Sequence, residues 1–118
     1  MKPPKALSGL ELRVRKADEA DFTPATKKLG VEVFRDDNSG ALLYISETGS
    51  IAAVPAPAEV KSGQGVSWKH AMTLKARPGG VNEFEKANKY GVEVFQDNNT
   101  GHLVYASETG SIAVLPRK

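Results

Sequence analysis

Alternation of apolar and polar residues is the strongest pattern along the chain. Leu10–Arg15 reads Leu-Glu-Leu-Arg-Val-Arg, and Met72–Arg77 repeats this pattern as Met-Thr-Leu-Lys-Ala-Arg. A period of two residues predicts a half-buried strand at each place. Three further apolar segments, Val31–Asp36, Leu42–Ser46 and Ser50–Val54, are separated by turns that contain glycine. They predict three more strands joined as hairpins.

The pattern occurs twice because the sequence contains an internal duplication. Gly30–Pro55 aligns with Gly91–Pro116 without a gap and is identical to it at 18 of 26 positions, and upstream of this segment the second copy lacks one residue. Each copy is near the lower size limit for folding alone, so we expect the two copies to complete one core. The predicted division is a tail over 1–9, repeat 1 over 10–55, a linker over 56–67 and repeat 2 over 68–118, in one pseudo-symmetric domain.

A short helix is predicted between the first two strands of each copy. Asp21 is a candidate N-cap in the first copy, and Asn82 with Glu85 resembles a capping box in the second. Gly30 and Gly91 would then end these helices. The predicted fold class is therefore α+β, a tandem internal duplication of a β-α-β-β-β unit with antiparallel sheets, short helices and a pseudo-two-fold arrangement.

The turns also predict a cross-strand register. A three-residue loop at Asn38–Gly40 places Phe34 opposite Tyr44, and a second one at Glu47–Gly49 places Tyr44 opposite Ala52. The same register is expected at the equivalent positions of the second copy.

This register divides each sheet into two faces. One face is aliphatic and is assigned to the core; it carries Val31, Val33, Leu43, Ile45, Ile51 and Ala53. The other face mixes aromatic and polar residues, which are Glu32, Phe34, Asp36, Leu42, Tyr44 and Ser46 in the first copy and Glu93, Phe95, Asp97, Leu103, Tyr105 and Ser107 in the second. All six residue types of the mixed face are the same in both copies, whereas the aliphatic face has changed at three hairpin positions.

The unchanged mixed face predicts an interaction surface. Packing of the copies against each other, within a chain or between chains, would use the same residues from both sides, and aromatic residues with a polar rim suit such a contact. We therefore expect a non-enzymatic interaction or assembly module with a protein partner or self-association. The alternative is a ligand-binding module that holds a polar ligand, such as a carbohydrate or peptide, at two equivalent sites.

Composition narrows these classes further. The net charge is only +2, from 16 Lys and Arg against 14 Asp and Glu, so binding of nucleic acid or another anion is a less favoured hypothesis. The four cations Arg13, Arg15, Lys75 and Arg77 would support it if the first strands adjoin. The chain has no cysteine, which excludes disulfides and thiolate sites. A cytoplasmic protein is expected, since no apolar run spans a membrane and Met1–Pro4 has no signal-peptide character.

Catalysis and metal binding find little support in the sequence. Asp36–Gly40 and Asp97–Gly101 resemble the start of a calcium loop, and Glu47 and Glu108 lie at the twelfth positions. However, the glycine is at the fifth position of the loop, and Asp, Asn and Gly are also the residues that hairpin turns prefer. No nucleophile elbow or phosphate-binding loop is present, so we predict no catalytic residues, no metal and no cofactor.

Overall fold

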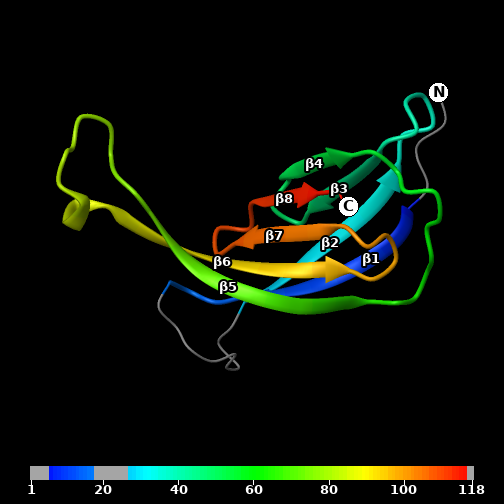
Figure 1. Cartoon of the computed structure of the whole chain (residues 1–118), viewed down its shortest axis with the longest axis horizontal. Helices are drawn as coiled ribbons and strands as arrows, with labels where there is room; N and C mark the ends of the chain where they lie inside the picture. Colours follow the sequence, from blue (N-terminus) through cyan, green and yellow to red (C-terminus); the bar gives the residue numbers. More distant parts are fainter. Residues whose placement is uncertain (1–5, 18–26, 117–118) are drawn as a thin grey trace.

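The computed structural model describes residues 6–17 and 27–116, and these ranges are almost entirely β structure. Sheet 1 contains four antiparallel strands in sequence order, and sheet 2 repeats this arrangement. The strands of sheet 1 are β1 (Ala6–Val14), β2 (Lys27–Arg35), β3 (Leu42–Ser46) and β4 (Ile51–Val54), and those of sheet 2 are β5 (Val66–Ala76), β6 (Asn88–Asp97), β7 (Leu103–Ser107) and β8 (Ile112–Leu115) (Figure 1). Hairpins therefore connect all neighbouring strands whose connections are described.

The predicted α+β class is wrong. Where a helix was expected in the second copy, the chain forms only the three-residue 3₁₀ turn η1 (Phe84–Lys86). Gly91 does not end a helix; it lies inside β6 and pairs with Thr73 of β5, and Gly30 likewise lies inside β2. The helix predicted between Asn82 and Gly91 would be short, and helices of fewer than about 12 residues are only marginally stable without tertiary packing. The proposed N-cap Asp21 lies outside the described residues.

The internal repeat is confirmed strand by strand. Both sheets have the same strand order, and both first hairpins carry an irregularity at the same place. It lies between Ala6 and Ser8 in β1 and between Trp68 and His70 in β5. These positions are equivalent once the residue that the second copy lacks is taken into account, so Trp68 corresponds to Ala6.

The predicted register is correct for one hairpin and shifted by one residue in the other. Tyr44 pairs with Ala52, as expected, but Tyr44 also pairs with Val33 rather than with Phe34. The loop between β2 and β3 holds four residues, because Asp36 N–H donates to Ala41 O at 2.9 Å. The second copy has the same shift, and Phe95 pairs with Val104 rather than with Tyr105. A shift of one residue moves every side chain of one strand to the other face.

The corrected register gives each sheet a Tyr face and a Phe face. The Tyr face carries Val31, Val33, Leu42, Tyr44 and Ser46 in the first copy and Val92, Val94, Leu103, Tyr105 and Ser107 in the second. The Phe face carries Glu32, Phe34, Leu43, Ile45 and Ile51 in the first copy, with Asp36 in the adjoining loop, and Glu93, Phe95, Asp97, Val104, Ala106 and Ile112 in the second.

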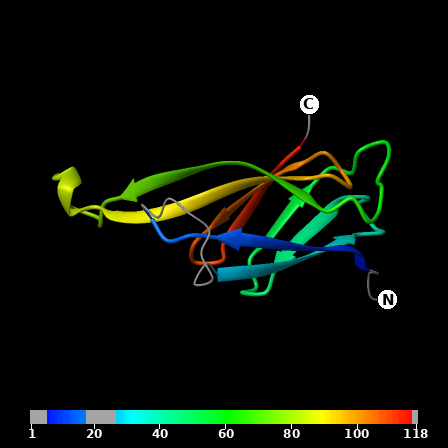
Figure 2. The same ribbon diagram turned by 90° about the horizontal axis from the view of Figure 1, so that it is seen from below.

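The two sheets pack through opposite faces. Figure 2 shows them as two layers, with the tip of the β5–β6 hairpin extending beyond the shared body. The core is built from the Tyr face of sheet 1 and the Phe face of sheet 2, and its buried members include Leu12, Leu29, Tyr44, Phe95 and Ala106. Because a two-fold contact would bury the same face of both copies, the predicted pseudo-two-fold arrangement is also wrong.

Candidate interaction surfaces

The twelve predicted site residues do not form two equivalent surfaces. Leu42, Tyr44 and Ser46 are buried under sheet 2, whereas Glu32 is exposed and Phe34 and Asp36 are half-buried outside the core. In the second copy the distribution is reversed. Glu93, Phe95 and Asp97 are buried, and Leu103, Tyr105 and Ser107 are half-buried on the outer side of sheet 2. The structure therefore brings together one half of each predicted set.

A buried hydrogen-bond cluster joins the two halves at one end of the core. The Tyr44 hydroxyl donates to Asp97 Oδ2 at 2.5 Å and lies 2.9 Å from Thr100 Oγ1. Asp97 Oδ1 accepts a hydrogen bond from the Asn99 N–H at 2.9 Å. Burial, helped by the Asp97 carboxylate, raises the pKa of Tyr44 well above its ordinary value of 10.0, so the phenol stays a donor.

An ion pair joins the sheets farther along β6. Arg15, just after β1, donates through Nε and Nη2 to the two carboxylate oxygens of Glu93, at 2.8 and 2.9 Å. The Trp68 indole N–H donates to the same carboxylate at 2.9 Å. Both charged side chains are almost inaccessible, at 10% and 2% exposure. A buried pair of this kind orients its partners strongly, because either charge alone would be costly in the interior.

Close backbone approach completes the contact. A Cβ atom added at Gly91 would lie 2.7 Å from Arg15 O, so only glycine lets the end of β1 cross β6. Where the β3–β4 turn meets the β7–β8 turn, the Ser46 and Thr48 hydroxyls donate to Gly110 O at 2.9 and 2.8 Å. The Ile112 N–H donates to Ser50 Oγ at 3.1 Å. Most of these groups have an equivalent in the other copy.

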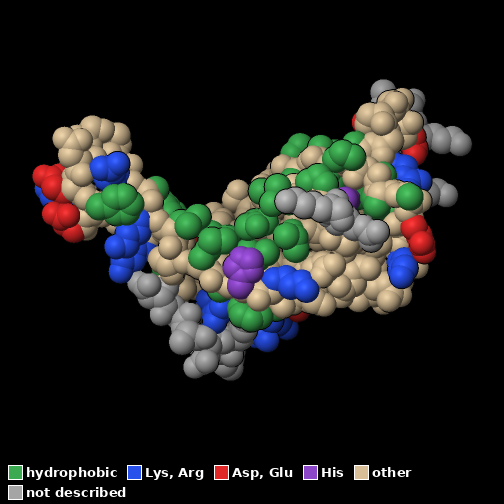
Figure 3. Space-filling model, in the orientation of Figure 1, with side chains coloured by type: hydrophobic (Ala, Val, Ile, Leu, Met, Phe, Trp, Pro, Cys, Tyr) green, Lys and Arg blue, Asp and Glu red, His purple; other side chains and the backbone are tan. Residues whose placement is uncertain are grey.

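The equivalents lie on the two outer faces. On the outer Tyr face of sheet 2, Leu74 and Leu115 are each 51% exposed, although their counterparts Leu12 and Val54 are buried at 0% and 3%. A hollow of about 350 Å³ runs between Met72, Leu74 and Tyr105 on this face. Figure 3 shows hydrophobic side chains gathered over sheet 2 on its concave side. Leu12 and Val54 thus have exposed counterparts on this face, whereas Val92 and Val94 of the same face stay buried.

The outer Phe face of sheet 1 shows the same relation. Ile51 is 65% exposed, whereas its counterpart Ile112 is only 6% exposed in the core. At the end of this face, Asp36 accepts hydrogen bonds from Asn38 N–H and from Ser39 Oγ, both at 3.0 Å. These bonds lower the pKa of the Asp36 carboxyl. The loop is thus held as in the second copy, where Asp97 accepts from Asn99 N–H and Thr100 Oγ1.

The same bonds account for the loop composition that resembles a calcium site. Asp36 and Asp97 satisfy their own turns, and Glu47 accepts a hydrogen bond from the Gly30 N–H at 2.9 Å. Within 6–17 and 27–116, no group of three or more His, Asp or Glu side chains is placed to hold a metal ion.

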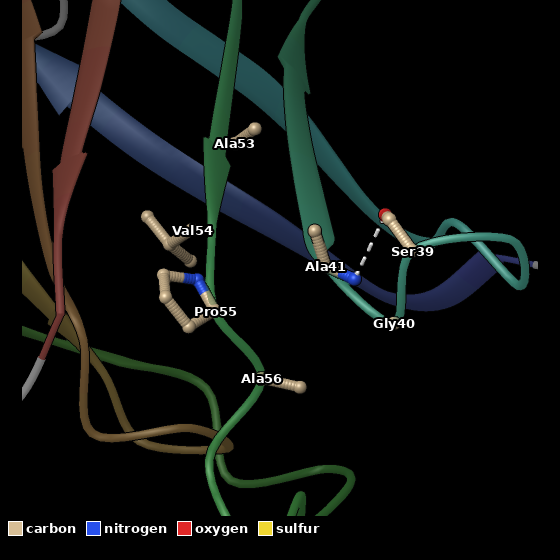
Figure 4. A pocket seen from close by; sticks show the side chains of 7 residues that line it. All are labelled: Ser39, Gly40, Ala41, Ala53, Val54, Pro55 and Ala56. Carbon is tan, nitrogen blue, oxygen red and sulfur yellow. Dashed lines mark hydrogen bonds between the residues drawn. The ribbon is translucent and has the colours of Figure 1, made fainter.

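One further hollow lies at the end of the Phe face of sheet 1. It measures about 530 Å³ and lies between the loop Ser39–Ala41 and the segment Ala53–Ala56. Figure 4 shows Ala53 and Ala56 on the side toward this loop, and the Ala41 N–H donates to Ser39 Oγ at 3.2 Å. In the second copy His102 stands in place of Ala41, and its Nε2 lies 3.2 Å from Pro55 O. All the residues that line the hollow in the first copy are small and uncharged.

The predicted site residues omit several groups that join the sheets, among them Arg15, Thr48, Thr100, His102 and Gly110. They also omit Trp68, which donates to Glu93 within sheet 2 and lies under Arg15 of sheet 1. Trp68 and His102 are positions where the copies differ, since the first copy has Ala6 and Ala41. In the sequence, such a position can be recognised because one copy has a large side chain with a ring N–H and the other has alanine. Every buried side-chain nitrogen or oxygen in the described ranges has a hydrogen-bond partner.

No protein-family model, curated protein or solved structure matches the chain. The 3₁₀ turn η1 spans three residues, and no helix in the described residues is long and apolar enough to cross a membrane.

Proposed function

We propose that this chain is a non-enzymatic interaction and assembly module that binds protein through its two outer faces, the Phe face of sheet 1 and the Tyr face of sheet 2. The observation that carries this proposal is that the two copies pack through opposite faces. One face of each type is buried in the core, and one of each type is left outside, with most residue types shared between the copies.

The exposed apolar side chains support protein binding. Ile51, Leu74 and Leu115 are at least half exposed, and each has a counterpart in the other copy that is buried in the core. Exposed apolar residues that cluster beside polar groups are typical of interaction surfaces. Here the chain itself contains an example of the contact that these faces make.

The alternative, a polar-ligand module with two equivalent sites, is less well supported. That hypothesis placed Phe34 and Tyr44 side by side on one open face, but Tyr44 pairs with Val33 and is fully buried. The hollow next to Ser39–Ala41 is lined by alanine, valine, proline, glycine and one serine, which offer a carbohydrate few orienting groups.

Site-specific photo-crosslinking in the cells that make the protein tests the proposed function. A photoreactive amino acid replaces Ile51 on the outer Phe face or Leu115 on the outer Tyr face, and Ser62 in the exposed linker is the matched control. We expect protein adducts at Ile51 and Leu115 well above those at Ser62. Adducts at neither face position, with normal folding of both variants, would contradict the proposal.

A further inference from the structure

We infer that the partner of the outer faces is a second copy of this chain, bound head to tail, so that the Tyr face of sheet 2 in one molecule packs on the Phe face of sheet 1 in the next. This inference rests on the proposed function and names its partner. The geometry is the one by which sheet 1 packs on sheet 2 within the chain, repeated once more between molecules.

The tyrosine cluster supplies the first matching contact. Inside the chain, Tyr44 donates to Asp97, which is already held by Asn99 and Thr100. Tyr105 is the counterpart of Tyr44 and is half-buried on the outer Tyr face. Asp36 is the counterpart of Asp97, and its loop already accepts the same two local hydrogen bonds at 3.0 Å. The acceptor is therefore organised for a phenol, and the head-to-tail contact delivers Tyr105 of the neighbouring molecule to it.

The ion pair supplies the second contact, through complementary charge. Arg15 and Glu93 are paired inside the chain, and their counterparts are Arg77 and Glu32. Both counterparts are exposed. Arg77 lies 5.2 Å from the centre of the Phe84 ring and donates to Asn82 O at 2.8 Å, both on the exposed β5–β6 hairpin. An arginine beside sheet 2 and a glutamate on the outer Phe face of sheet 1 thus lie on the two surfaces that the head-to-tail contact brings together.

Gly30 supplies the third contact, and a glycine at this position is the feature most specific to the head-to-tail geometry. Its counterpart Gly91 must be glycine because β1 crosses it, with Arg15 O only 2.7 Å from an added Cβ. Gly30 is exposed on the outer side of β2, and an added Cβ would meet only Glu47 Oε1 at 3.9 Å. Glycine weakens a strand, and nothing in the described part of one molecule requires it at this position. In the head-to-tail contact, the segment after β5 of the neighbouring molecule crosses Gly30 as the end of β1 crosses Gly91.

The hydroxyl pair at the sheet edge also recurs. Ser46 and Thr48 lie 2.7 Å apart and both donate to Gly110 O. Ser107 and Thr109 form the same pair at 2.7 Å on sheet 2. The carbonyl of Gly49, the counterpart of Gly110, is the acceptor that the neighbouring molecule offers to them.

The contact between molecules lacks two bonds of the contact within the chain. Ala41 replaces His102, which bonds to Pro55 O, and Ala6 replaces Trp68, which donates to Glu93. Association between molecules is therefore weaker than packing within one molecule and depends on concentration. Because the contact joins two different faces, it does not end at a dimer; it continues until a ring closes or a filament grows.

Two complementary variants test the head-to-tail geometry by sedimentation velocity. Variant 1 carries Gly30→Ala and Ile51→Lys and blocks the outer Phe face. Variant 2 carries Leu74→Lys and Leu115→Lys and blocks the outer Tyr face. We expect the wild-type chain to form species beyond the dimer as concentration rises, and each variant alone to remain a monomer of 12.6 kDa. An equimolar mixture should form a dimer of twice that mass and nothing larger, because one functional face of each type remains.

The alternative outcomes separate this inference from the proposed function. If either variant alone still forms a dimer, the contact joins like faces and the head-to-tail geometry is wrong. If the wild-type chain stays monomeric at its highest soluble concentration, a second copy is not the partner, and photo-crosslinked adducts with other proteins would then carry the proposed function alone. Equal urea midpoints of both variants and wild type, measured on dilute samples, ensure that a loss of association is not a loss of folding. The single variant Gly30→Ala, which adds one methyl group and no charge, should reduce association by itself.

Discussion

Tyr44 and Tyr105 occupy equivalent positions in two copies of one sequence, yet Tyr44 is fully buried and bonded to Asp97, whereas Tyr105 is half-buried on the outer face of sheet 2. This difference follows from the packing of opposite faces. It also means that the chain contains its own controls, because most contact residues have an equivalent of the same type outside the contact.

The two tyrosines should therefore differ in their contribution to stability. Tyr44→Phe removes the donor to the buried Asp97 carboxylate and should lower the free energy of unfolding by about 1–3 kcal/mol. Tyr105→Phe should change it by less than about 0.5 kcal/mol, as is usual for surface positions. Urea unfolding of dilute samples measures both values, and equal effects would show that the two faces are used alike.

The two arginines should show a larger difference. Arg15→Ala leaves Glu93 charged in the core, where the Trp68 indole N–H still donates to it, and should cost about 3–5 kcal/mol. Arg77→Ala removes an exposed side chain and should have little effect on the monomer. Thermal and urea unfolding check this prediction. A stable Arg15→Ala variant would mean that Glu93 is accessible to water.

The two strand glycines provide a steric comparison. Gly91→Ala places a methyl group against the backbone at Arg15–Ala17 and should destabilise the monomer by about 1–3 kcal/mol. Gly30→Ala meets only ordinary van der Waals contact and should leave the monomer as stable as wild type, or slightly more stable. Unfolding midpoints decide the comparison, and a tolerant Gly91 would contradict the crossing of β1 over β6.

Stability should fall at alkaline pH because of Tyr44. Burial raises the pKa of this phenol above 10.0 in the folded chain, so above pH 10 the unfolded chain loses a proton that the folded chain retains. The stabilisation is therefore present below pH 10 and is lost as pH rises beyond it. Tyr44→Phe should make this decline shallower, and Tyr105→Phe should retain it. Unfolding free energies measured between pH 8 and 11 test the prediction; identical slopes in all three proteins would refute it.

The sequence predicted the parts of the fold that depend on one copy. Duplication, hairpins and the pairing of Tyr44 with Ala52 follow from repeats, turn residues and alternation. The first loop is one residue longer than predicted, because Asp36 accepts the Asn38 N–H and thereby sets a four-residue turn. That single residue exchanged the faces and separated Phe34 from Tyr44.

The choice of buried face could not be predicted from a pattern that both copies share. The decision lies in the few positions where the copies differ. Val104 and Ala106 replace the larger Leu43 and Ile45 on the Phe face of sheet 2, where both are fully buried. Smaller side chains let the sheets approach. His102 adds a hydrogen bond to Pro55 O, just after β4 of sheet 1, and Trp68 adds one to Glu93, the ion-pair partner of Arg15. The changes on the expected core face thus reflected two different environments.

Packing of the sheets through opposite faces gives the two tyrosine rings different surroundings, which nuclear Overhauser contacts can measure. The measurement uses dilute Gly30→Ala protein, which is expected to be monomeric. The structure predicts a contact between the Tyr44 ring and the Thr100 methyl group, since the Tyr44 hydroxyl lies 2.9 Å from Thr100 Oγ1, and no inter-sheet contact of the Tyr105 ring. A two-fold arrangement would instead give Tyr44 and Tyr105 equivalent contacts with the other sheet. Such contacts would contradict packing through opposite faces.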